Sequence, residues 1–167
     1  GPNQLFTNLG GGKFREDSAA MKVQGNSWSV SAAWADFDRD GDLDLYVAND
    51  FGRNNLFRND QLPGGGIRFR DVAGELGVED MASGMSVAWA DYNRDGKMDL
   101  YVGNMFSAAG SRITYQDAFK PGAPEVRTRL QRFARGNTLL KNLADGTFSD
   151  VSTDAGLTMG RWAWSSN

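Results

Sequence analysis

Short stretches in which apolar and polar residues alternate are the dominant pattern of this chain. The clearest stretch starts at Ile67, where apolar and charged side chains alternate as far as Arg70. Alternation with a period of two predicts half-buried antiparallel strands. Glycine-rich turns separate such stretches, as at residues 10–12 and 64–66, and aromatic residues are frequent. The pattern predicts short strands joined by tight turns and argues against a helical bundle.

Two blocks of sequence recur along the chain. Trp34 and Trp89 lie 55 residues apart, and the acidic residues that follow them keep the same spacing. A second block, in which an apolar strand ends in asparagine and a glycine turn follows, begins near residues 3, 54 and 136. Together the blocks give a unit of four strands. A four-stranded unit that repeats is the signature of a β-propeller blade.

Counting the units gives two complete blades and parts of two more. Residues 28–72 form one predicted blade and residues 85–151 form a second, longer one. Residues 4–16 supply the last two strands of a preceding blade, and residues 159–167 the opening of a following one. Propellers close with at least four blades. The predicted fold is therefore all-β and forms part of a larger propeller ring. The rest of the propeller or another chain must complete this ring, and we favour a fragment of a longer propeller over a unit that assembles with copies of itself.

The loop between the first two strands of each unit carries side-chain oxygens at alternate positions, and a glycine follows the fifth position, at Gly41 and Gly96. Ca²⁺ takes six to eight oxygen ligands, including carboxylates and backbone carbonyls. Clustered carboxylates also repel one another without a cation. We therefore predict two calcium sites. Their ligands are Asp36, Asp38, Asp40, Asp42 and Asp44 in the first loop and Asp91, Asn93, Asp95, Lys97 and Asp99 in the second, with Asp42 and Lys97 acting through their backbone carbonyls.

Other interpretations of these loops fit less well. An EF-hand needs a bidentate glutamate at the twelfth position, where this chain has Val47 and Val102. Magnesium prefers a compact, water-rich octahedron. Solvent-exposed Asp-Gly turns would explain one loop, but not the same spacing twice. Because Asn93 and Lys97 reduce the negative charge of the second loop, the first loop is expected to bind Ca²⁺ more tightly.

An insertion at residues 105–136 lengthens the second blade. Pro124 is a suitable first residue of a helix and Gly136 a suitable end. The insertion carries six basic and two acidic side chains, which leaves the remainder at −7. One predicted face of the helix is an apolar stripe and the opposite face is basic. The stripe is Val126, Leu130, Phe133 and Ala134; the basic residues are Arg127, Arg129, Arg132 and Arg135.

Two interpretations of this helix stay open. In the first, the apolar stripe packs on its own blade and the arginines pair with nearby carboxylates. In the second, the arginines form a contact surface for an acidic or sugar-bearing partner. In an antiparallel blade, the connection between strands two and three lies at the end opposite the loop between strands one and two. The insertion and the calcium loops are therefore expected on opposite faces.

Composition narrows the function. The chain has 167 residues, a net charge of −3, no cysteine and no histidine. Disulfides and thiolate sites are excluded, and the side chain that most readily moves protons near neutral pH is missing. We expect no catalytic site, no nucleic-acid partner and no membrane span. Trp34 and Trp89 occupy equivalent blade positions, which favours packing between blades over sugar stacking by the set Trp28, Trp34, Trp89, Trp162 and Trp164.

The segments "ADFDRDGDLDLYVAN", "NNLFRN" and "FRDVAGELGV" resemble the FG-GAP or VCBS repeats of integrin-α-like β-propellers. The resemblance covers nearly the whole chain and is closest to secreted proteins related to cartilage acidic protein, which often end in an ASPIC/UnbV domain. It implies a seven-bladed ring in which the acidic loop of each blade binds Ca²⁺. The Phe-Gly…Gly-Ala-Pro sequence of the repeat and an ASPIC/UnbV segment are absent here, and the third copy ends before its acidic loop.

The predicted function follows from these features. We expect a calcium-binding propeller segment of an extracellular, periplasmic or cell-surface protein, serving adhesion, protein binding or assembly with a protein or glycan partner. A carbohydrate-binding propeller and a non-catalytic scaffold attached to an enzyme are the alternatives.

Overall fold

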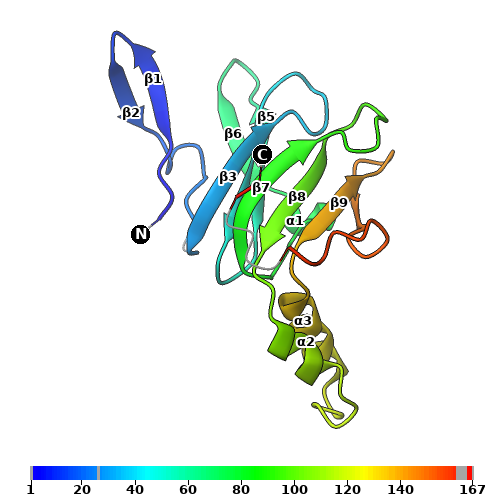
Figure 1. Ribbon diagram of the computed structural model, residues 1–167. Helices are drawn as coiled ribbons and strands as arrows, with labels where there is room; N and C mark the ends of the chain where they lie inside the picture. Colours follow the sequence, from blue (N-terminus) through cyan, green and yellow to red (C-terminus); the bar gives the residue numbers. More distant parts are fainter. Residues whose placement is uncertain (1, 26, 161–164, 167) are drawn as a thin grey trace.

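A computed structural model describes residues 2–25, 27–160 and 165–166 (Figure 1). Strands dominate in these ranges, where they form three antiparallel sheets. The first is a hairpin of β1 (Phe6–Gly10) and β2 (Lys13–Glu16). The second contains β3 (Ser29–Ala35), β4 (Asp44–Asn49), β5 (Asn55–Gln61) and β6 (Ile67–Asp71). The third contains β7 (Gly84–Ala90), β8 (Asp99–Asn104), β9 (Thr138–Asn142) and β10 (Phe148–Asp150). The all-β prediction with four-stranded antiparallel blades is confirmed.

Each four-stranded sheet is a meander in which sequence neighbours pair, in the orders β3-β4-β5-β6 and β7-β8-β9-β10. The two sheets repeat each other closely. Trp34 pairs with Leu45 in one and Trp89 with Leu100 in the other, and an irregularity interrupts the register near the start of both β3 and β7. The 55-residue repeat of the sequence is thus a repeat of strand register.

The β1–β2 hairpin lies to one side of β3, as Figure 1 shows. Phe6, Leu9 and Phe14 are each more than half exposed, so the hairpin buries little apolar surface. At the other end of the chain, residues 161–164 and 167 lie outside the described residues. The opening of a following blade, predicted at 159–167 with Trp162 and Trp164, therefore lies largely outside them.

The main core lies between the two four-stranded sheets. Tyr46 and Leu56 of one sheet and Leu100 and Leu140 of the other are fully buried in one cluster. Trp89 closes this cluster: its ring meets Tyr46 edge-on at 6.2 Å, and its indole N–H donates to a carbonyl of β3 at 3.4 Å. The prediction that Trp89 packs between blades is confirmed.

The described part of the chain also contains three helices: α1 (Ala73–Leu76), α2 (Ala108–Thr114) and α3 (Pro124–Arg135). The last two form the insertion, and the predicted helix from Pro124 to Gly136 is confirmed, with proline in its first turn and Gly136 at its C-cap. Figure 1 shows loops 36–43 and 91–98 at the upper end of the sheets and α2–α3 at the lower end. The predicted separation of loops and insertion is confirmed.

Candidate metal centre and insertion face

The two acidic loops share one backbone geometry. The fourth position is left-handed in both, with φ of 63° at Arg39 and 60° at Arg94. The sixth position is also left-handed, with φ of 95° at Gly41 and 81° at Gly96. Such angles strain an ordinary residue and suit glycine. Both loops therefore turn sharply twice, which brings alternate side chains to the inside of the turn.

In the first loop, Asp36, Asp38 and Asp40 each place a carboxylate oxygen within 4.8 Å of the other two. One oxygen of Asp36 accepts a hydrogen bond from the Gly41 N–H at 3.1 Å. The other, Oδ1, is buried and has no hydrogen-bond partner. A buried oxygen without a partner is unfavourable unless a cation or water binds it. This hard-oxygen set fits Ca²⁺.

Mutual repulsion acts on this loop. Burial, followed by the charge of Asp40, raises the pKa of Asp38, and burial with the same neighbour raises the pKa of Asp42. A carboxylate whose pKa is raised is disfavoured as an anion. A bound cation would reverse that penalty, so the electrostatics of the first loop favour one.

Asp44, at the ninth position, is fully buried and lies outside the group of three carboxylates. Its oxygens accept hydrogen bonds from the backbone N–H of Phe37 at 3.2 Å and of Asn59 at 2.9 Å. Burial raises the pKa of Asp44 to about 7, although both hydrogen bonds lower it. The side chain thus ties the loop to strand β5, whether or not it also binds metal.

The second loop closes on itself. Asp91 accepts hydrogen bonds from the N–H groups of Asp95 and Gly96 at 3.0 and 2.8 Å. The Asn93 amide donates to Asp95 at 3.0 Å, and the Lys97 ammonium lies 4.0 Å from the same carboxylate. The hydrogen bond from the Lys97 N–H, followed by that from Asn93, lowers the pKa of Asp95. Internal partners therefore stabilise this loop in part without a cation.

Asp99 repeats the role of Asp44. It is buried and accepts from the N–H groups of Tyr92 at 3.3 Å and Asn142 at 2.8 Å. Sequence reasoning did not assign a role to Asn59 and Asn142, which hold the two ninth-position carboxylates through their N–H groups. The available signal was the asparagine at the same position of the third strand in both copies, after "LFR" in one and "LLK" in the other.

The insertion packs differently from the expected arrangement. Of the apolar stripe, only Ala134 is buried; Val126, Leu130 and Phe133 are 43, 37 and 37% exposed. The first interpretation is therefore wrong for the stripe, but its other part is confirmed for Arg132 and Arg135, which pair with carboxylates. The helix turns its polar side inward instead, because the neighbouring elements offer carbonyl and carboxylate oxygens.

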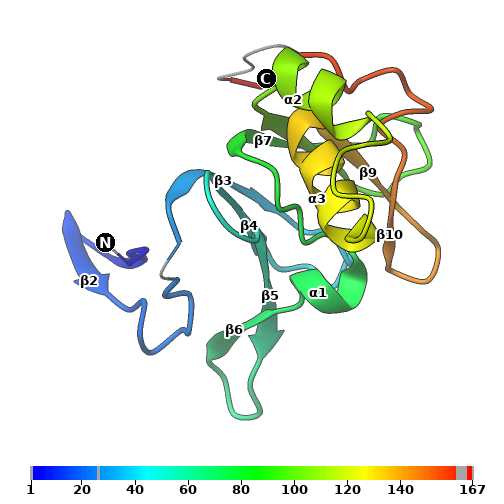
Figure 2. The ribbon, with the colours of Figure 1, turned by 90° about the horizontal axis from the view of Figure 1, so that it is seen from below.

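Three of the four arginines have partners inside the protein, so the four do not form one exposed basic surface. Arg127 donates to the carbonyls of Thr114 and Tyr115 at 3.0 and 3.2 Å, which joins α3 to α2. Figure 2 shows the two helices side by side. Arg132 and Arg135 turn toward carboxylates, whereas Arg129 is exposed and makes no ion pair within the described residues.

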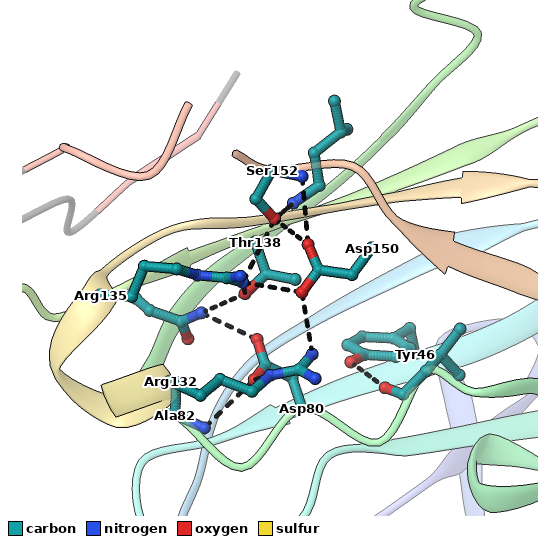
Figure 3. Close-up of polar contacts among 11 residues, drawn as sticks. Tyr46, Asp80, Ala82, Arg132, Arg135, Thr138, Asp150 and Ser152 are labelled. Carbon is teal, nitrogen blue, oxygen red and sulfur yellow. Dashed lines mark hydrogen bonds and ion pairs between the residues drawn. The ribbon is translucent and has the colours of Figure 1, made fainter. Parts of the chain in front are cut away.

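An ion cluster at the base of α3 joins the helix to the blades (Figure 3). Arg132 lies 3.4 Å from the fully buried Asp80 and 3.6 Å from Asp150, and Arg135 lies 2.9 Å from Asp150. Asp80 also accepts from the Asn104 amide at 2.8 Å. Because Asp80 lies in the connection before β7 and Asp150 ends β10, the cluster fixes the insertion both to that connection and to the second blade.

A model of the FG-GAP-like repeat matches residues 1–47 and 36–102, which together include the first four-stranded unit, β7 and β8 of the second, and both acidic loops. The chain belongs to the FG-GAP-like repeat family. The acidic loops described above are therefore loops of FG-GAP-like repeats, at equivalent positions in two successive blades.

Known relatives of this FG-GAP-like chain are cartilage acidic proteins. It is 27% identical over 147 residues to cartilage acidic protein 1 of Mus musculus and 28% identical over 148 residues to that of Homo sapiens, with 87% of this chain covered in each case. The Xenopus tropicalis protein is 44% identical over 62 residues, 36% of this chain and 9% of its own length. The chain spans 21 and 20% of the length of the two mammalian relatives.

Within the described ranges, no helix is long and apolar enough to cross a membrane.

Proposed function

We propose that this chain is a calcium-stabilised propeller segment whose first acidic loop is the stronger of two Ca²⁺ sites. Two observations carry the proposal: Asp36, Asp38 and Asp40 each place a carboxylate oxygen within 4.8 Å of the other two, and one buried Asp36 oxygen lacks a partner. The carbonyl of Asp42 would add a ligand from the turn. Bound Ca²⁺ supplies the positive charge that these groups otherwise lack.

Calcium has a structural role in this proposal. The loop lies between β3 and β4, and Asp44 links it to β5. Fixing the loop would therefore fix the relative positions of three strands of one blade. The second loop, with its internal hydrogen bonds and Lys97 near Asp95, would bind more weakly.

The test is the melting temperature with calcium and with a chelator. At a calcium concentration of 100 Kd, binding contributes about 2.7 kcal/mol, which for a chain of this length raises the melting temperature by about 5–10 °C. Asp38→Asn should reduce this increase. Asp154→Asn removes the same charge from an exposed site away from the loops and should leave it unchanged. If neither calcium nor the chelator changes the melting temperature, the proposed calcium binding is wrong.

We further propose that the full protein is extracellular and that this segment serves as an interaction scaffold without catalysis. The similarity to cartilage acidic proteins and the lack of histidine and cysteine support this. The outer face of the insertion is the proposed partner surface. Arg112, Lys120 and Arg129 of the insertion are exposed without an ion pair among the described residues, and Leu130 and Phe133 are 37% exposed. An acidic protein or glycan fits this combination.

A carbohydrate-binding propeller based on tryptophan is the weaker candidate. Trp28 and Trp34 are 74 and 45% exposed. However, Trp34 contacts Phe69 at the register where Trp89 contacts Phe148. Since Trp89 packs against the preceding blade, the exposed surface of Trp34 is better explained as a surface on which a neighbouring blade packs.

A further inference from the structure

Asn142 touches both acidic loops. Its backbone N–H donates to Asp99, the ninth residue of the second loop, at 2.8 Å. Its side-chain amide donates to the carbonyl of Met98 in the same loop at 3.2 Å and to the carbonyl of Phe37 in the first loop at 3.0 Å. The residue is 2% exposed, so water does not compete for these bonds.

Phe37 is well placed to transmit an effect from the first loop. It lies between Asp36 and Asp38, two of the three clustered carboxylates. Its N–H donates to Asp44 at 3.2 Å, and its ring stacks on Trp89 of the next blade, with 6.3 Å between the centroids and 11° between the planes. Any change in the backbone between Asp36 and Asp38 therefore displaces the carbonyl that Asn142 holds.

A second contact joins the loops at their tips. A Cβ atom added to Gly96 would lie 2.8 Å from a guanidinium nitrogen of Arg39. Real Cβ atoms do not approach so closely, so the arginine of the first loop lies directly against the glycine turn of the second. The two loops thus meet both at the base, through Asn142, and at the turn.

We propose that Asn142 couples the two loops, so that a divalent cation bound in one loop raises the affinity of the other. The inference rests on the proposed calcium function and adds a regulation to it. A cation that fixes Asp36 and Asp38 fixes the Phe37 carbonyl between them, and with it the Asn142 amide. The Asn142 backbone then holds Asp99 in place for the second loop. Because coupling is reciprocal, a cation in the second loop favours the first equally.

Asn59 is the matched residue of the preceding blade and provides the control. Its N–H donates to Asp44 as that of Asn142 does to Asp99. Its amide, however, donates at 3.3 Å to Leu43 in its own loop, and Asn59 Oδ1 is buried without a partner. Asn59 therefore supports one loop, whereas Asn142 supports two.

The experiment measures calcium binding by calorimetry in the chain and in a variant whose second loop is disabled, Asp91→Asn with Asp95→Asn. The coupling factor is the Kd of the first loop when the second loop is disabled, divided by the Kd of the first loop when the second loop holds calcium. One shared buried hydrogen bond corresponds to a factor of about five. In Asn142→Ala, which keeps the backbone bond to Asp99, the factor should fall to about one. In Asn59→Ala it should persist while the first loop binds more weakly.

A second measurement does not depend on the Asn142 variant folding. In the protein with the disabled second loop, calcium at the first loop should slow hydrogen exchange at the Tyr92 and Asn142 amides, which donate to Asp99. If both loops bind calcium but the coupling factor is near one, or if hydrogen exchange at these amides does not change, the proposed coupling is wrong. The proposed calcium function would not be affected by either result. A chain that binds no calcium at either loop would overturn both.

Discussion

Replacing Arg132 with methionine should destabilise the protein more than replacing Leu130 with glutamine, the reverse of what the amphipathic pattern of α3 suggests. Arg132 faces inward and lies 3.4 Å from Asp80, whose side chain is fully buried. Methionine keeps the length and helix propensity of arginine but removes the cation. Asp80 would then keep only its hydrogen bonds from the Ala82 N–H and the Asn104 amide.

The expected magnitudes differ clearly. Removing one partner of a fully buried ion pair costs about 3–5 kcal/mol. Arg132 is itself 35% exposed and the Asp80 hydrogen bonds remain, so we expect about 2 kcal/mol. Leu130 is 37% exposed, and glutamine has nearly the same helix propensity. Its replacement should cost less than about 1 kcal/mol.

Urea unfolding at saturating calcium measures both changes. With a denaturant slope of about 2 kcal/mol per molar, Arg132→Met should lower the midpoint by about 1 M, and Leu130→Gln by less than half of that. Arg129→Met makes the same chemical change on the exposed side of α3 and should shift the midpoint by less than about 0.3 M. If Leu130→Gln were the more damaging variant, the helix would be packed by its apolar stripe and the inward orientation of its arginines would be refuted.

Two further predictions concern charge. Burial raises the pKa of Asp150, but hydrogen bonds from Ser152 and Arg135 outweigh burial and lower the pKa below its usual value. The ionised carboxylate therefore stabilises the fold above about pH 4. This stabilisation is lost as the pH falls through the pKa of Asp150 in the folded protein. The difference in unfolding free energy between the wild type and Asp150→Asn should shrink from pH 6 to pH 3, and a constant difference would contradict the assignment. The exposed cations of the insertion should also retain the chain on immobilised heparin at low salt, with Arg129→Gln and Arg112→Gln together eluting earlier; no retention of the wild type would refute an acidic glycan as the partner.

The repeated strands could be predicted from the sequence because each blade is a local structure. Alternating residues, a glycine turn and a return strand are all contained within a single unit, and the second unit provided an independent check on the first. The acidic loops were predictable for the same reason, since their side chains are separated by only a few residues. The bracing role of Asn59 and Asn142 was harder to see, because each reaches a carboxylate 15 or 43 residues away.

The orientation of α3 shows where local pattern stops being informative. An apolar stripe normally marks the buried face of a helix, but this holds only if the surface beneath the helix is apolar. Here that surface presents Asp80, Asp150 and the carbonyl of Thr114. Asp80 lies in the connection before β7, 52 residues before Arg132 in the sequence. The sequence of the helix therefore gives no indication that a carboxylate lies beneath it. Burying the stripe there would have left two carboxylates without a cation nearby, and leaving a buried charge without its partner is costly. Arg132 and Arg135 supply that positive charge, and Leu130 and Phe133 are left partly exposed on the outer side of the helix.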